Sequence, residues 1–283
     1  MKTHADMPAL SLATADGSTT IPQLGFGVWQ VPDSEVDAAV ATALEVGYRH
    51  LDTARIYGNE EGVGRAIAAS ELPREEIFVT TKVWNDDQGR ERTRVALERS
   101  LERLGLDVLD LYLIHWPAPR LDTYVETWEA LRELRDEGLV RAIGVCNFGA
   151  DHLKRLYKET GEWPAINQVE LHPYLQQEAL RRFHAGHGIV TESWSPLASG
   201  KEVLDDLALG AIADAHGVTP AQVILAWHRQ LGLVVIPKSV TPSRIRENFD
   251  SLDVQLTEAE MLTIATLDRG WRTGPDPDEF HGG

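Results

Sequence analysis

The chain has 283 residues, of which 43% are hydrophobic and 25% charged, and its formal net charge is −17 at pH 7. This composition can bury a large core, which excludes an intrinsically disordered chain, and the acidic balance argues against nucleic acid or an anionic membrane surface as a partner. No apolar run is long enough to cross a membrane, and the first ten residues lack the apolar region of a signal peptide. The single cysteine, Cys146, excludes an internal disulfide, so we expect a cytoplasmic protein.

The first part of the chain predicts a β-hairpin, and the rest predicts a repeating pattern. Two short stretches of alternating apolar residues flank Asp16 and Gly17, a dipeptide that favours a tight hairpin turn. Short apolar stretches typical of buried strands follow, and we predict eight of them, at residues 26–29, 48–53, 77–82, 109–116, 141–147, 165–171, 188–194 and 233–239. A helical stretch comes after each strand, at residues 34–46, 60–70, 91–104, 123–137, 151–158, 177–184, 205–230 and 242–249.

The alternation of strands and helices predicts a parallel sheet covered by helices. Eight units in a chain of this length favour a closed (β/α)8 TIM barrel over an open doubly wound sheet, because no G-x-G-x-x-G motif follows the first strand. No linker or low-complexity stretch interrupts the pattern. Residues 1–283 are therefore expected to form one domain, with an N-terminal β-hairpin, an extra C-terminal helix at 257–267 and an irregular tail at 270–283.

The second predicted strand ends in an acid, and a tyrosine follows it in the next loop. Side chains alternate between the two faces of a strand, so Asp52 shares a face with Tyr48 and His50. A buried carboxylate without a partner costs several kcal/mol, so Asp52 requires a partner. Tyr57 comes five residues later. An inward acid followed by a tyrosine outlines a catalytic site, although a helix-capping aspartate and a surface tyrosine explain this stretch equally well.

The third and fourth predicted strands end in two further reactive side chains, Lys82 and His115. In a barrel of this type, function lies at the C-terminal ends of the strands. A solvated lysine and a core histidine are the more common explanations for each residue alone. Together with Asp52 and Tyr57, however, they bring an acid, a tyrosine, a lysine and a histidine to one rim of the barrel.

These four side chains suit proton transfer to a carbonyl oxygen. Tyrosine has an ordinary pKa of about 10, and we expect a nearby ammonium, that of Lys82, to lower it. Asp52 would keep Lys82 charged and in position, and His115 would donate a hydrogen bond to the substrate oxygen. The combination predicts protonation of an oxygen that becomes alkoxide-like while the carbonyl is reduced.

Carbonyl reduction requires a hydride carrier, because no side chain stores hydride, and nicotinamide is the usual one. A cluster of cations follows the eighth predicted strand, with Lys238 and Ser239 at the strand end and Arg244 in the first turn of the next helix. Backbone N–H groups at a helix start and the planar guanidinium of arginine both favour a phosphate. In an acidic chain this cluster predicts NADPH rather than NADH. A surface lysine and an ordinary helix-start arginine are the alternative.

Long motifs in this order resemble the aldo-keto reductases nearly from end to end. They are GFGVWQV, GYRHLDTARIYGNEEGVG, TKVWN, LDLYLIHWP, GLVRAIGVCNF, NQVELHPY, ESWSPLA and IPKSVTPSRIRENF. Within the family, the chain most resembles the bacterial 2,5-diketo-D-gluconate reductases. The resemblance implies that Asp52, Tyr57, Lys82 and His115 form a catalytic tetrad in which Tyr57 is the general acid.

The resemblance also implies residues that hold NADPH. Asn147 and Gln168 would bind the carboxamide of the nicotinamide, and Trp194 would stack on its ring. The other cofactor-binding positions implied by the family are Cys146, Ser195 and Leu197, together with Lys238, Ser239, Val240, Thr241, Arg244, Glu247 and Asn248 around the 2′-phosphate and adenine.

Two positions depart from the family pattern. Cys146 stands where the family usually has serine, so a thiol, which is a weaker hydrogen-bond donor, replaces a hydroxyl. A small buried barrel residue is an equally good explanation of this cysteine. The loop after Ser195-Pro196-Leu197 continues through Ala198 where relatives usually have glycine. This loop borders the substrate pocket in relatives, so the identity of the substrate cannot be carried over.

Three tryptophans, Trp29, Trp84 and Trp116, end or follow predicted strands and would line an apolar pocket for a small carbonyl compound. Trp271 and Phe280 in the tail are candidates to fold over it. Diketo-sugar acids and small dicarbonyls are the substrates that we consider. We expect no metal site and a monomer. The alternative function is that of an NADP(H)-binding redox sensor or partner subunit with weak turnover.

Overall fold

The computed structural model describes residues 7–14, 17–200 and 202–282. An antiparallel hairpin, β1 (Ala9–Thr14) and β2 (Gly17–Pro22), precedes an eight-stranded parallel sheet, as the sequence predicts. Asp16, half of the predicted turn, lies outside the described residues. Among the described helices, none is long and apolar enough to cross a lipid bilayer.

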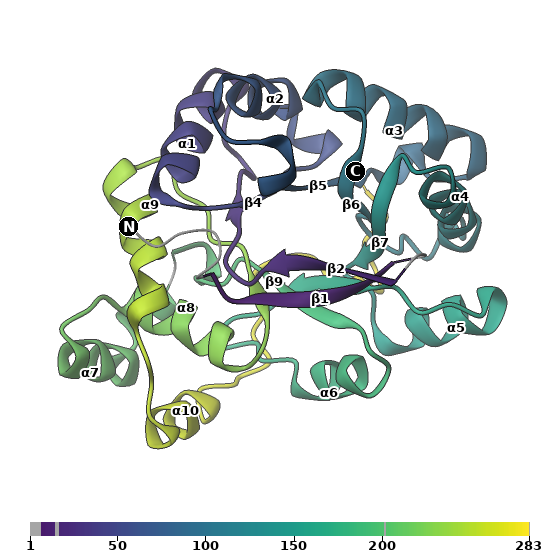
Figure 1. The fold of residues 1–283 in the computed structure, drawn as a ribbon. Coiled ribbons are helices and arrows are strands. Elements are labelled where there is room, and N and C mark those ends of the chain that lie inside the picture. The colour runs from purple at the N-terminus through teal and green to yellow at the C-terminus, as the bar shows by residue number, and fades with distance from the viewer. Residues whose placement is uncertain (1–6, 15–16, 201, 283) are drawn as a thin grey trace.

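The strands of the sheet follow one another in chain order around a barrel (Figure 1). They are β3 (Phe26–Gly27), β4 (His50–Asp52), β5 (Phe78–Val83), β6 (Leu109–Ile114), β7 (Val140–Cys146), β8 (Ile166–Glu170), β9 (Val190–Trp194) and β10 (Val234–Val235). The first and last strands meet, because Gly25 N donates to Val235 O at 2.9 Å and Gly27 N to Pro237 O at 3.0 Å. This closure confirms the predicted (β/α)8 barrel. That residues 1–283 form a single domain stays a prediction.

The described residues form ten α-helices, and these surround the sheet. They are α1 (Asp33–Val46), α2 (Glu60–Ala69), α3 (Arg90–Leu104), α4 (Tyr124–Asp136), α5 (Ala150–Thr160), α6 (Glu178–Gly186), α7 (Leu207–His216), α8 (Pro220–Gln230), α9 (Pro242–Asp250) and α10 (Glu258–Ala265). The helical stretch predicted at 205–230 consists of two helices, α7 and α8. Gly217 ends α7 in the left-handed conformation with φ of 66°, and Thr219 starts α8 with a capping box and a proline in the first turn.

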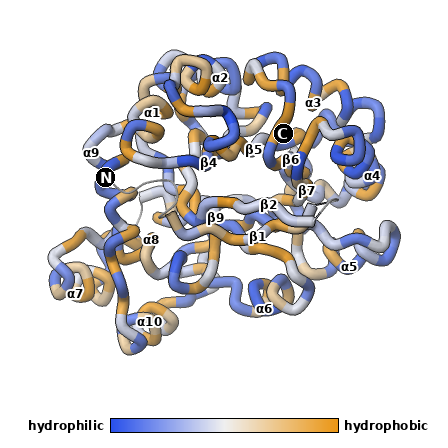
Figure 2. The backbone as a smooth tube through the Cα atoms, in the orientation of Figure 1, coloured by the Kyte–Doolittle hydropathy of each residue, from blue (hydrophilic) through white to orange (hydrophobic). Residues whose placement is uncertain are grey.

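The hairpin closes one end of the barrel. Leu12 of β1 and Ile21 of β2 are fully buried and pack in one cluster with Phe78, the first residue of β5, and with Leu111 and Ala142 inside the barrel. In Figure 2 the central strands are largely hydrophobic, whereas hydrophilic residues concentrate on the outer faces of the helices. The hairpin therefore seals the N-terminal end of the strands and leaves the opposite end for the site.

Helices α2 and α3 approach each other closely at Gly64. A Cβ atom at this position would lie 2.5 Å from the carbonyl oxygen of Leu104 and 2.9 Å from that of Arg103, both backbone atoms that cannot move aside easily. The close approach therefore requires a residue without a side chain.

We predict that Gly64→Ala lowers the free energy of unfolding by about 1–3 kcal/mol, because the added methyl group overpacks the contact between the two helices. Chemical denaturation measures this change. Gly210→Ala is the matched control, since Gly210 lies in α7 with no atom within 4 Å of the added Cβ. The control is expected to be neutral or stabilising by up to about 1 kcal/mol, because alanine favours helix. Equal effects of the two substitutions would contradict the steric explanation.

Candidate active site

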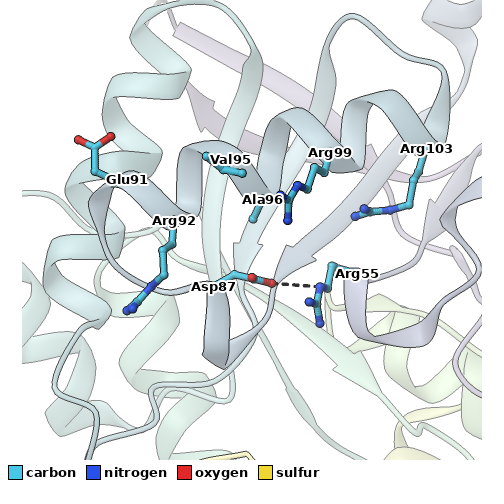
Figure 3. A pocket seen from close by; sticks show the side chains of 8 residues that line it. All are labelled: Arg55, Asp87, Glu91, Arg92, Val95, Ala96, Arg99 and Arg103. Carbon is cyan, nitrogen blue, oxygen red and sulfur yellow. Dashed lines mark ion pairs between the residues drawn. The ribbon is translucent and has the colours of Figure 1, made fainter.

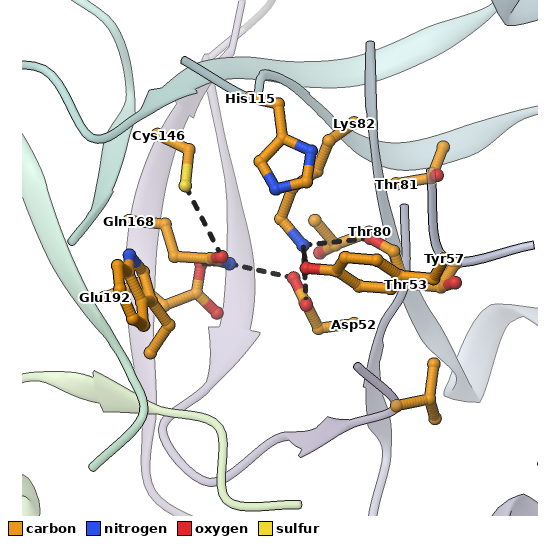
Figure 4. A network of polar contacts seen from close by, with 12 residues as sticks. Asp52, Thr53, Tyr57, Thr80, Thr81, Lys82, His115, Cys146, Gln168 and Glu192 are labelled. Carbon is orange, nitrogen blue, oxygen red and sulfur yellow. Dashed lines mark hydrogen bonds and ion pairs between the residues drawn. The ribbon is translucent and has the colours of Figure 1, made fainter. Parts of the chain in front are cut away.

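The four side chains that the sequence places at the rim lie together in the structure. Asp52 ends β4, Lys82 lies near the end of β5, and His115 directly follows β6. Tyr57 ends η2 (Arg55–Tyr57), a short 3₁₀ helix after β4. Figure 4 shows the four side chains grouped around the Lys82 ammonium. Strands β5 and β6 thus bring Lys82 and His115 next to Asp52 and Tyr57, which lie at and after the end of β4, as predicted.

Lys82 is fully buried, and its ammonium is surrounded by oxygen atoms. Nζ donates to Asp52 Oδ1 at 2.7 Å, to the backbone oxygen of Thr53 at 2.9 Å and to Tyr57 Oη at 3.4 Å. Burial is the largest single influence and lowers the pKa of Lys82, but the Asp52 carboxylate and the other groups around the ammonium together outweigh it, so the pKa lies above its ordinary value. The lysine is therefore charged throughout the physiological range of pH, as expected.

The expected direction of the Tyr57 pKa is wrong for the ligand-free protein. Burial is the largest influence, and it raises the pKa of the phenol above its ordinary value, while the Lys82 ammonium lowers it only in part. The sequence indicates the ammonium but not how completely the phenol is desolvated. Tyr57 therefore carries its proton at neutral pH, which is the state that a proton donor requires.

His115 is a neutral imidazole. Burial and then the Lys82 ammonium lower the pKa of His115 well below its ordinary value. Its Nδ1 atom has no hydrogen-bond partner among the described residues, and its ring contacts the edges of Tyr57 and Trp84, with centroids 5.7 Å and 5.1 Å away. A neutral ring in this position can donate a hydrogen bond without adding charge.

Gln168 of β8 extends the network from Asp52 across the barrel. Its Nε2 atom donates to Asp52 Oδ2 at 2.8 Å and to Glu192 Oε2 at 2.9 Å, so both of its amide hydrogens are used. Its Oε1 atom accepts from the Cys146 thiol at 3.7 Å. The thiol thus donates to Gln168, and burial raises the pKa of Cys146 well above its ordinary value, so that it stays a thiol.

Asn147 and Trp194 lie on the same side of the barrel. Asn147 Nδ2 donates to the backbone oxygen of His115 at 3.0 Å and contacts Cys146 Sγ at 3.1 Å, while its Oδ1 accepts from Trp194 Nε1 at 2.8 Å. The amides of Asn147 and Gln168 and the indole of Trp194 are therefore adjacent to the tetrad, as the family resemblance implies. Ser195 and Leu197, the next two predicted contacts, follow β9 and are half-buried.

Glu192 belongs to the same hydrogen-bond network, and the sequence did not point to it. Its side chain is fully buried, and its Oε1 atom lies 3.7 Å from His50 Nε2. Burial raises the pKa of Glu192 to about 8, and Asp52 adds to the shift, whereas burial lowers the pKa of His50 to about 3. Both groups are therefore uncharged at neutral pH. The alternation that puts Glu192 on the same face as Trp194 could have identified it.

The predicted phosphate-binding residues lie at the end of β10 and the start of α9. Lys238, Thr241 and Arg244 are exposed together with Val240, while Ser239 and Asn248 are buried and Glu247 is half-buried. Among the described residues, neither Lys238 nor Arg244 has an ion-pair partner, and Ser239 Oγ accepts from Thr241 N at 3.1 Å. Two unpaired cations beside a helix start fit an anion well. The Glu247 carboxylate instead accepts from Thr219 Oγ1 at 2.9 Å.

The C-terminal tail completes the aromatic wall of the site. Phe280 packs on Trp116 and Trp84, with centroids 4.4 Å and 6.3 Å away. Trp29 lies outside this cluster and is 47% exposed. Phe280 thus lies against two of the predicted pocket tryptophans, whereas Trp271 packs against Tyr174 and His172.

A second missed residue, Glu170, holds this tail. The carboxylate of Glu170 is fully buried and accepts from Thr273 N at 2.6 Å, Thr273 Oγ1 at 2.5 Å and Gly274 N at 3.1 Å. A Cβ atom at Gly274 would lie 2.5 Å from the Trp194 ring, so the tail runs directly against that ring. No local sequence signal connects Glu170 to residues more than a hundred positions later.

The chain matches the aldo/keto reductase family over residues 22–269. The protein belongs to this family. Methylglyoxal reductase DkgA of Salmonella typhimurium is 57% identical over 268 residues, which cover 94% of this chain and 96% of that protein. A crystal structure of an aldo/keto reductase from Brucella melitensis is 52% identical, with a TM-score of 0.88 and coverage of 93% of this chain and 100% of that chain. A variant of Gox0644 solved in complex with NADPH is 48% identical, with a TM-score of 0.91 and coverage of 96% and 99%.

Family membership confirms the predicted enzyme class, an aldo-keto reductase built on a (β/α)8 barrel. The predicted cofactor, NADPH, is the one bound in the Gox0644 variant. The geometry brings together the four side chains of the tetrad, the amides of Asn147 and Gln168 and the ring of Trp194. The roles of the individual residues in this reductase stay predictions.

We predict that Glu192→Gln changes how stability depends on pH. Glu192 has a pKa of about 8 in the folded protein and 4.5 as an ordinary carboxyl, so the folded state holds an extra proton between these values. The contribution of Glu192 to the free energy of unfolding is therefore largest below about pH 4.5, and it is lost as the pH rises toward 8. Glutamine cannot ionise, so the variant should lose less stability than the native protein between pH 5 and pH 8.

Thermal unfolding of both proteins across this range measures the difference. Glu178→Gln is the control, because Glu178 is an exposed residue of α6 paired only with Arg182. The interpretation is wrong if Glu192→Gln and the native protein show parallel changes of Tm with pH.

Proposed function

We propose that this reductase transfers hydride from NADPH to the carbonyl carbon of small aldehydes and ketones, with Tyr57 protonating the oxygen. The observation that carries the proposal is the position of the Lys82 ammonium, which contacts both Asp52 and Tyr57 inside a buried site. Neutral His115 adjoins the tyrosine ring.

Each member of the tetrad has one task in this proposal. Tyr57 donates its proton to the oxygen as negative charge develops there, and the Lys82 ammonium stabilises the phenolate that remains. Asp52 holds Lys82 at 2.7 Å and compensates its charge. His115 donates a hydrogen bond to the carbonyl oxygen and so orients the substrate. Because Tyr57 and Lys82 act on the developing charge, their contribution is largest in the transition state.

NADPH, when bound, supplies the hydride. We assign its carboxamide to Asn147 and Gln168. Since both amide hydrogens of Gln168 are bonded to Asp52 and Glu192, the oxygen of Gln168 is the atom left to accept from the carboxamide N–H. We assign stacking on the nicotinamide ring to Trp194 and the 2′-phosphate to Lys238 and Arg244, where unpaired cations support the assignment.

We propose small dicarbonyl compounds, such as methylglyoxal or a diketo-sugar acid, as the substrates. The aromatic wall of Trp84, Trp116 and Phe280 supports a compact molecule, because aromatic rings present a flat apolar surface beside the polar rim. The similarity to an enzyme named methylglyoxal reductase points to the same class. We also propose that the enzyme acts as a cytoplasmic monomer, since one chain supplies all the assigned residues.

We predict that Tyr57→Phe lowers kcat by about 10²–10⁴-fold, because the phenyl ring keeps the packing but cannot donate a proton. The dissociation constant of NADPH should change by less than about twofold, since Tyr57 is not assigned to cofactor binding. Loss of NADPH absorbance with methylglyoxal and cofactor fluorescence titration measure the two quantities.

Retention of the native kcat in Tyr57→Phe would rule out this mechanism. A native protein that binds NADPH but oxidises it negligibly with dicarbonyls, sugars and aldehydes would instead favour the redox-sensor or partner-subunit function.

We predict that Arg244→Ala raises the dissociation constant of NADPH by about 10-fold or more and leaves that of NADH nearly unchanged, because hydrogen bonds to a charged group contribute about 1.5–3 kcal/mol. Arg246→Ala is the control, since Arg246 is an exposed arginine of the same helix with no assigned role. An equal loss of affinity for both cofactors in Arg244→Ala would refute the assignment of the 2′-phosphate.

A further inference from the structure

A second concave surface lies on the outside of the barrel wall, between α3, η2 and η4 (Asn85–Asp87). It encloses about 350 Å³ and is lined by arginines from both sides together with the carboxylates of Asp87 and Glu91, as Figure 3 shows. We call it the arginine groove and define it by Arg55, Asp87, Arg92, Arg99 and Arg103.

The arginines of α3 face the groove because of their spacing. Arg92, Arg99 and Arg103 are seven and four residues apart, which places them on one side of a helix with 3.6 residues per turn. Arg55 of η2 faces them from the other side (Figure 3). Four arginine side chains therefore line one groove in a chain whose formal net charge is −17.

Carboxylates neutralise only part of this positive charge. Arg55 Nε lies 3.1 Å from Asp87 Oδ2, and Arg103 Nη2 lies 2.6 Å from Glu60 Oε2. Arg92 Nε donates only to a backbone oxygen, that of Gln88, at 2.7 Å. Arg99 has no partner among the described residues. Among the described residues, the guanidinium groups of Arg92 and Arg99 therefore have no ion-pair partner, although the Glu91 carboxylate also lines the groove.

A buried hydroxyl without a partner lies behind the groove. Tyr112 of β6 is fully buried, and its Oη atom has no hydrogen-bond partner in the described part of the chain. Burial raises the pKa of Tyr112, the charges of Glu60 and Asp87 raise it further, and those of Arg103 and Arg55 oppose them. Asp87, Arg103 and Arg55 belong to the groove, and leaving a buried donor unpaired is unfavourable.

We propose that the arginine groove binds a small phosphorylated metabolite. The planar guanidinium groups of Arg92 and Arg99 would hold the phosphate in paired hydrogen bonds, because this geometry matches phosphate oxygens. Val95 and Ala96, between these arginines on α3, supply apolar surface for the carbon part of the ligand. This site is separate from Lys238 and Arg244, to which the phosphate of NADPH is assigned.

The groove adjoins the catalytic loops. Arg55 is two residues from Tyr57, and Asp87 follows Trp84 by three, so the ion pair between Arg55 and Asp87 joins the loops after β4 and β5. A phosphate that competes with Asp87 for Arg55 would alter this connection. Binding in the groove would thereby influence the position of η2.

Isothermal titration of the full chain with inorganic pyrophosphate, in the presence of saturating NADPH and at constant ionic strength, tests the proposal. NADPH fills its own site, so the titration reports a second one. We expect saturable binding with one site per chain. Arg99→Ala should weaken it by about tenfold or more, because charge-assisted hydrogen bonds are lost.

Two further variants test where on the protein the pyrophosphate binds. Arg182→Ala, on α6, removes an exposed arginine paired only with Glu178 and should leave binding unchanged. Arg246→Ala, on α9, should also leave it unchanged, because this exposed arginine has no assigned role and NADPH still fills its own site. The absence of saturable binding, equal binding by Arg99→Ala and the native protein, or a loss in Arg246→Ala instead of Arg99→Ala would each overturn the proposal. Thermal unfolding of each variant verifies that it is folded.

Discussion

The buried ion pair between Lys82 and Asp52 is the constraint on which the rest of the site depends. A fully buried ammonium is stable only with close acceptors, and losing one partner of such a pair typically costs about 3–5 kcal/mol. Here the acceptors are Asp52 and the oxygen of Thr53, both at the end of β4. The pair therefore fixes how β4 lies beside β5, and η2 then places Tyr57 against the same ammonium.

The polar interior of the barrel also has to balance its charge. Lys82 and Asp52 supply one charge of each sign, and the low pKa of His50 and the raised pKa of Glu192 keep those two groups neutral. An ionised Glu192 would add an uncompensated negative charge beside Asp52. Gln168 lies between the two carboxyl groups and donates to both, so it separates them while fixing the direction of its own oxygen.

Sequence periodicity predicts most of this architecture, because each strand is a short apolar stretch and its last residues define the rim. Asp52, Lys82 and His115 are therefore recognisable as a group, because they end neighbouring strands. The direction in which the Tyr57 pKa shifts cannot be predicted in this way, because it depends on how far the folded barrel excludes water from the phenol. The same holds for Glu170, whose partner in the tail is set by tertiary packing. The boundary between α7 and α8 is marked in the sequence by Gly217, Thr219 and Pro220, which are typical of a helix end followed by a helix start.

The tail that Glu170 holds has a practical consequence for handling the protein. From Gly274, beside the Trp194 ring, the chain runs through Phe280 at the aromatic wall to Gly282, where a Cβ atom would lie 3.0 Å from Asn85 Nδ2. Any sequence fused after this point would therefore begin next to the aromatic wall of Trp84, Trp116 and Phe280. Purification tags and fusion partners are better kept away from this end of the chain, because they would crowd the side chains of the tetrad.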